Sequence, residues 1–206
     1  AKSPSLPVLE NVRLKACAHS GHIWAYATNL EVSLVARTDG IIDADIDITV
    51  PARTLADLTK YLSGEPIELI YDASDVSLRI KQGKSSTKVK GIPSDQFPPM
   101  PQPDGAVTLI LPAEQWKALL GVEHAISTNE ARPSLQGAYV TLNGKAEAAA
   151  TDGFRIAIRK DATVQVEQEV SCLIPGQSIK LILAMMEGDV TGYFVPGSMV
   201  MFQDES

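Results

Sequence analysis

The stretch AAATDGFRIAIRK, residues 148–160, resembles an earlier stretch of the same chain, AYATNLEVSLVAR, residues 25–37. In each, an apolar run ends in Ala-Thr, a short polar turn follows, and apolar and polar residues then alternate. Alternation on both sides of a turn is typical of two antiparallel strands. The two stretches lie about 124 residues apart, and the same offset recurs elsewhere in the chain.

Two further pairs of landmarks lie at nearly the same offset. Leu9 corresponds to Leu135, and the Pro that follows an apolar strand at Pro51 corresponds to Pro175. Three landmarks in the same order predict two copies of one structural unit. Each copy has the size of a domain, because the period is far longer than the roughly 20 to 50 residues of solenoid repeats.

The second copy predicts strands mixed with helices. Residues 106–112 alternate as a strand, and Pro112 begins a helix over residues 113–126. A hairpin at 138–142 and 147–150 turns at Asn143-Gly144, since Asn-Gly favours a type I′ turn. The remaining expected elements are strands at 154–159, 170–174, 190–195 and 198–203, and a helix after Pro175. This order predicts the α+β class.

The two copies differ at their ends. Residues 1–104 contain no counterpart of the first strand and helix of the second copy, and residues 105–206 contain no counterpart of residues 84–92. Prolines and glycines in FPPMPQPDG, residues 97–105, predict an extended linker between the copies. We therefore expect two incomplete domains, 1–104 and 105–206, in a fragment of a longer protein.

Composition and motifs argue against membrane and catalytic proteins. The chain is 45% hydrophobic with a net charge of -7, and no apolar run reaches the roughly 18 to 20 residues that span a bilayer. Cys17 and Cys172 are expected to be free thiols in a reducing cytoplasm. His19 and His22 lie in an expected hairpin loop, where a solvated turn is the better interpretation than a metal site. Motifs of common enzyme classes are absent, so we expect neither catalysis nor a cofactor.

Several segments resemble a known family. SLPVLENVRLKA, ATNLEVSLVAR, ITVPARTLADLTKYL, KGIPSDQFPPMP, HAISTNEARPSLQGAYV and ATDGFRIAIRK are similar, in unbroken order, to segments of the bacterial DNA polymerase III β subunit, the sliding clamp family. The resemblance implies a DNA-clamp fold of three like domains, of which this chain supplies most of the first and second. It also implies a processivity factor that encircles duplex DNA in the cytoplasm and tethers the replicative polymerase.

In that family, helices line the hole of the ring. The resemblance therefore implies that basic residues on or beside the helices face DNA, and these are Arg53, Lys60, Lys117, Arg132 and Lys180. Contacts to phosphates would hold DNA without reading its sequence, which suits an acidic chain whose cations gather on one face.

The resemblance also implies a pocket for short hydrophobic peptides of DNA polymerase III and clamp-loader subunits. The matching positions are Leu135, Thr151, Gly153, Phe154, Arg155 and Ile156. Phe154 stands where the family often has His, and Ile156 where it often has Leu. We expect Phe154, Ile156 and Ile158 to share one strand face. The first copy has Asn29-Leu30 and no glycine in its turn, so we expect the special turn only in the second copy.

The resemblance also implies how subunits assemble. In the family, an edge strand of domain one pairs with domain three of a second subunit, and here that strand is GKSSTKVKG, residues 83–91, with Lys84, Thr87 and Val89 on it. Lys84, Lys88 and Lys90 would discourage wrong partners. The full-length family forms a ring-shaped homodimer, which we do not expect of this chain alone. The alternative is a β-rich protein-interaction module without a DNA role.

Overall fold

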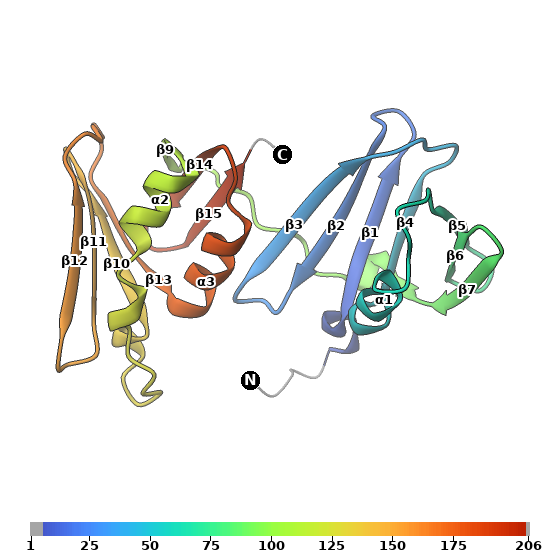
Figure 1. Cartoon of the computed structure of the whole chain (residues 1–206), viewed down its shortest axis with the longest axis horizontal. Helices are drawn as coiled ribbons and strands as arrows, with labels where there is room; N and C mark the ends of the chain where they lie inside the picture. The colour runs from blue at the N-terminus through green and yellow to red at the C-terminus, as the bar shows by residue number, and fades with distance from the viewer. Residues whose placement is uncertain (1–5, 205–206) are drawn as a thin grey trace. The chain divides into compact units, whose positions relative to one another are not determined.

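A computed structural model describes residues 6–204 of the chain. The chain divides into two compact units, Ala1–Met100 (unit 1) and Pro101–Ser206 (unit 2), both drawn in Figure 1. Each unit combines antiparallel sheets with short helices, so the predicted α+β class is confirmed. Within the described residues, no helix is long and apolar enough to cross a membrane.

Unit 2 has two sheets, with strand orders β12-β11-β10-β13 and β15-β14-β9. Helices α2 and α3 contact each other, and both contact strands of the first sheet. The elements are β9 (Val107–Pro112), α2 (Ala113–Leu120), η3 (Glu123–Ala125), η4 (Pro133–Leu135), β10 (Gly137–Leu142), β11 (Ala146–Thr151), β12 (Ile156–Asp161), β13 (Val170–Pro175), α3 (Gly176–Met185), β14 (Asp189–Val195) and β15 (Met199–Asp204).

The core of unit 2 is built around Trp116 on α2, which has no exposed surface. Its indole Nε1 donates a hydrogen bond to the Val190 carbonyl at 3.0 Å, and its ring meets the Phe202 ring edge-on at 5.0 Å between centroids. A Cβ on Gly192 would come within 2.8 Å of the indole ring. The glycine therefore lets strand β14 approach the tryptophan closely.

Unit 1 has sheets ordered β3-β2-β1-β4-β8 and β5-β6-β7. The elements are η1 (Pro7–Glu10), β1 (Asn11–Cys17), β2 (His22–Thr28), β3 (Ser33–Asp39), β4 (Ile46–Pro51), α1 (Ala52–Thr59), β5 (Glu68–Asp72), β6 (Ser77–Gln82), β7 (Ser85–Lys90), β8 (Ile92–Pro93) and η2 (Ser94–Gln96).

The predicted repeat is confirmed, because the two units share one order of elements and one sheet topology. Strands β1, β2, β3 and β4 correspond to β10, β11, β12 and β13, and both sets have the same antiparallel pairing. Helices α1 and α3 each begin directly after a strand that ends in proline, Pro51 or Pro175. Hairpin β5-β6 then corresponds to β14-β15.

Unit 1 differs where unit 2 has β9 and α2. Residues 6–100 contain no counterpart of these two elements, so β5 lies at a sheet edge whereas β14 pairs with β9. Helix α1 has no buried residue, while Ile179 of α3 is fully buried in unit 2. The core of unit 1 is correspondingly small, with Leu14, Ile48, Val50, Leu78, Ile80 and Val89 buried.

Several predicted boundaries are wrong. The helix expected over 113–126 ends at Leu120, since Gly121 leaves helical geometry with ψ 13° and a separate 3-10 turn, η3, follows. Lys84 was expected on the edge strand but lies in the turn before it, because β7 begins at Ser85.

Candidate functional site

The turn between β11 and β12 is held by its own side chains. The Thr151 hydroxyl accepts a hydrogen bond from the Gly153 amide at 3.1 Å and donates one to the Arg155 carbonyl at 2.7 Å. The Asp152 carboxylate accepts the amides of Phe154 and Arg155 at 2.9 and 3.0 Å. Hydrogen bonds from these amides lower the pKa of Asp152, and the amide of Phe154 has the largest effect. Because both amides are occupied, β12 begins at Ile156 rather than at Phe154.

The same turn occurs in unit 1, so the expectation that it belongs to the second copy alone is wrong. The Leu30 amide donates to the Thr28 hydroxyl at 3.0 Å, and the Asn29 side chain accepts the amides of Glu31 and Val32 at 3.0 and 2.7 Å. Leu30 has φ 74° where Gly153 has φ 92°. The turn therefore forms with either residue, although a leucine in the left-handed region costs about 1–2 kcal/mol.

A hollow of about 130 Å³ lies beside the turn of unit 2. Strands β10, β11, β12 and β13 and the short η4 provide its walls. Its lining consists of Ser134, Leu135, Gly137, Tyr139, Ala149, Ala150, Thr151, Ile156 and Leu173. The lining combines small residues, such as Gly137 and Ala149, with larger apolar ones, such as Leu135 and Ile156. No lining residue carries a charge at neutral pH, so the hollow suits an apolar side chain rather than acid–base chemistry.

The structure brings three of the predicted pocket residues together at this hollow: Leu135, Thr151 and Ile156. Gly153, Phe154 and Arg155 lie in the adjoining turn and are not part of its lining. Phe154 lies in the turn, before β12 begins at Ile156, so the expectation that the two share a strand face is wrong. Its side chain is 100% exposed.

Six of the nine lining residues were missed by the sequence reasoning, among them the two large ones, Tyr139 and Leu173. Strand pairing places Tyr139 directly opposite both Ala149 and Leu173, so the three side chains share the sheet face away from the core. The available signal was alternation in strand 138–142, where Ala138, Val140 and Leu142 are buried and Tyr139 is 51% exposed.

The predicted DNA-facing residues lie on or next to helices. Arg53 is on α1, Lys60 follows it, Lys117 is on α2 and Lys180 is on α3. Lys60 and Lys117 form ion pairs with acidic residues of their own helices at 2.7 and 2.9 Å. Arg132 instead precedes η4, and its Nη1 lies 3.4 Å from where a Cβ on Gly153 would be, so its guanidinium sits beside the turn.

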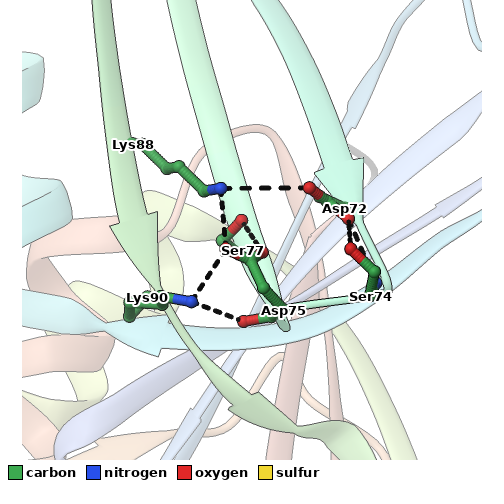
Figure 2. A network of polar contacts seen from close by, with 6 residues as sticks. All are labelled: Asp72, Ser74, Asp75, Ser77, Lys88 and Lys90. Carbon is green, nitrogen blue, oxygen red and sulfur yellow. Dashed lines mark hydrogen bonds and ion pairs between the residues drawn. The ribbon is translucent and has the colours of Figure 1, made fainter.

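Within the described residues, the predicted edge strand β7 pairs with β6 alone. Val89 faces the core of unit 1 and is 7% exposed, while Lys88 and Lys90 reach the Asp75 carboxylate at 2.7 and 2.8 Å (Figure 2). These two lysines, with Ser77, hold the pKa of Asp75 far below its ordinary value. Two of the three lysines expected to deter wrong partners, Lys88 and Lys90, thus form ion pairs within their own unit.

Known protein families match both units. Residues 1–101 match the N-terminal domain of the DNA polymerase III beta subunit, and residues 111–200 match its central domain. The chain belongs to the DNA polymerase III beta subunit family. The resemblance read from the sequence is therefore confirmed, and the two units correspond to two successive domains of this family.

Curated relatives of this beta subunit family member are beta sliding clamps. The protein of Synechocystis sp. is 31% identical over 183 residues, 85% of this chain and 47% of the relative. That of Chlamydia pneumoniae is 29% identical over 192 residues, 90% of this chain and 51% of the relative. The chain thus spans about half the length of the curated relatives it matches.

Solved beta subunit structures share the fold. The DNA polymerase III beta subunit of Pseudomonas aeruginosa superposes with a TM-score of 0.86 at 26% identity, over 98% of this chain and 56% of its own. The beta subunit of Streptococcus pyogenes has a TM-score of 0.90 at 21% identity, over 100% and 56%. The predicted DNA-clamp fold is confirmed.

Proposed function

We propose that this chain is part of a DNA sliding clamp, a processivity factor that encircles duplex DNA and tethers the replicative polymerase in the bacterial cytoplasm. The observation that carries the proposal is the match of both units, in order, to the N-terminal and central domains of the beta subunit. Such a role needs no catalysis and no cofactor. In the described residues, no group of three or more His, Cys, Asp or Glu side chains could hold a metal ion.

The DNA contacts of the proposed clamp come from cations on its helices. Arg53 and Lys180 are exposed on α1 and α3. The ion pairs of Lys60 and Lys117 lie at the surface, where such pairs contribute only about 0.3–0.5 kcal/mol, so both lysines are free to exchange their carboxylates for phosphates. Arg132 belongs to the same proposed set. Weak phosphate contacts of this kind bind without sequence preference and permit sliding.

The hollow of unit 2 is the proposed docking site for short hydrophobic peptides of DNA polymerase III and clamp-loader subunits. Its volume of about 130 Å³ fits one apolar side chain, whose burial contributes about 1.5–3 kcal/mol. That is too little for tight binding, so residues outside this chain would have to complete the site. The beta sliding clamp of C. crescentus has a similar structure, with 28% identity and a TM-score of 0.83. It was solved with polyethylene glycol bound to a region described as a beta-motif tethering region.

Peptide titration tests this docking site. With a clamp of full length that carries this sequence, Ile156→Asp should weaken a labelled polymerase C-terminal peptide at least tenfold, because it places a charge on the apolar lining. Gly153→Ala should weaken it less, through a turn strained at φ 92°. Ile110→Asp is the matched control, since Ile110 is 64% exposed on β9, outside the lining. Equal affinities of the wild type and a folded Ile156→Asp would contradict the proposal.

A further inference from the structure

The sheet of unit 1 has an aromatic and basic face opposite its core. Lys15, Trp24 and Arg37 stand in one row across β1, β2 and β3. Leu14 and Ala25, the adjacent cross-strand pair, belong to the core side, so the row points away from it. Trp24 is half-buried, whereas Lys15 and Arg37 are exposed. Among the described residues, neither cation has an ion-pair partner within 4.0 Å.

The acidic residues of this face are already occupied. Arg13 binds Asp47 through two hydrogen bonds of 2.8 and 2.6 Å and lies 5.9 Å from the centre of the Tyr26 ring. His22 contacts Asp39 at 2.7 Å. Tyr26 and His22 flank Trp24 on the same side of β2, so the strand carries three consecutive outward rings with cations beside them.

The corresponding face of unit 2 shows that the fold does not require this pattern. The row that matches Lys15, Trp24 and Arg37 consists of Thr141, Glu147 and Lys160. Glu147 is neutralised there by Lys160 at 3.1 Å and Lys145 at 3.7 Å. Among the described residues, a half-buried tryptophan between two cations that form no ion pair within 4.0 Å therefore occurs in unit 1 alone. Lys15 stands opposite Asp47, which is itself bound by Arg13.

We propose that this face binds single-stranded nucleic acid. Aromatic side chains two residues apart on a strand stand about 6.6 Å from each other, so Trp24 and Tyr26 offer two successive stacking positions. Lys15 and Arg37 lie on either side to contact phosphates. An acidic peptide would use the cations and leave the rings without a role. This site shares no residue with the helix cations proposed to contact duplex DNA. It can therefore be tested independently of them.

Tryptophan fluorescence provides a direct test with this chain. The chain has two tryptophans, and since Trp116 is fully buried, a stacked base should quench mainly Trp24. Titration with a short oligothymidylate, which forms no duplex with itself, should quench the emission. Two phosphate contacts predict that log K falls with log salt at a slope of about -1.4, and Lys15→Ala or Arg37→Ala should halve that slope.

Labelled oligothymidylate and fluorescence anisotropy then compare variants. Trp24→Ala should weaken binding roughly tenfold, because alanine has no ring on which a base can stack. Trp24→Phe should retain most of the affinity, because its aromatic ring can still stack. Lys160→Ala, at the position of Arg37 in unit 2, is the matched control and should change nothing. Circular dichroism confirms that each variant is folded.

Three results would overturn the inference. One is the absence of binding and quenching at low salt. Another is equal binding of a polyglutamate peptide, which would make the face an acidic-peptide site. The third is a loss in Lys160→Ala as large as that in Arg37→Ala, which would show that binding reflects charge without this site.

Discussion

At the scale of single residues, Leu30 and Gly153 occupy one position in two copies of the same turn, with φ of 74° and 92°. Leu30→Gly should raise the stability of unit 1 by about 0.5–1 kcal/mol, since relief of about 1–2 kcal/mol is offset by the greater freedom of glycine in the unfolded chain. Gly153→Ala should lower the stability of unit 2 by about 1 kcal/mol. Denaturation followed at Trp24 for unit 1 and Trp116 for unit 2 measures each effect, and a destabilising Leu30→Gly would contradict it.

The two cysteines should differ in reactivity. Burial raises the pKa of the Cys172 thiol to about 11, whereas hydrogen bonds from the Ser20 backbone and side chain lower the pKa of Cys17. The thiolate is the reactive form, so a thiol reagent at pH 8 should modify Cys17 well before Cys172. Reaction kinetics with peptide mass mapping check the order, with Cys17→Ser as the control. Equal rates in the folded chain would refute the assignment.

At the scale of elements, the network around Asp75 joins edge strand β7 to the turn before β6 (Figure 2). The lowered pKa of Asp75 means that its ionised carboxylate stabilises the fold at pH values above the ordinary carboxyl range, which lies near pH 4. This contribution to stability is lost as the pH falls below that range. Asp75→Asn should therefore accelerate amide exchange in β7 at neutral pH. Acidification should then destabilise the variant less than it destabilises the wild type. Asp43→Asn, in the exposed loop after β3, is the control. Unchanged exchange in β7 would show that the network does not hold the strand.

Sequence patterns predicted most elements and the start of each helix, because proline directly precedes α1, α2 and α3 at Pro51, Pro112 and Pro175. They did not predict which face of β12 is buried. Ile156 and Ile158 are 66% and 48% exposed, while Ala157 packs against the core. Strands β11 and β12 present small side chains to α2, so the large apolar ones point outward. Hydrophobic alternation cannot tell a core face from an apolar binding face, and here it failed at the candidate site.

At the scale of the whole molecule, the repeat and the family resemblance could be read from the sequence, since three landmarks recur at one offset. The interior of unit 1 could not be predicted from the sequence. Helix α1 has no buried residue, and the core of unit 1 is smaller than that of unit 2. The net charge of -7 says little about DNA binding, since the proposed contacts depend on where a few cations lie. Encirclement therefore predicts retention of the clamp on closed DNA rather than high affinity for DNA.

Retention on circular DNA tests that claim most directly. A clamp of full length that carries this sequence, loaded onto a nicked circle and washed at high salt, should remain bound until the circle is cut, and then dissociate from the ends. The 206-residue chain alone, for which we expect no closed ring by light scattering, is the control and should wash off both forms. Equal loss of the full-length protein from circular and linear DNA would contradict the account and favour a β-rich interaction module without a DNA role.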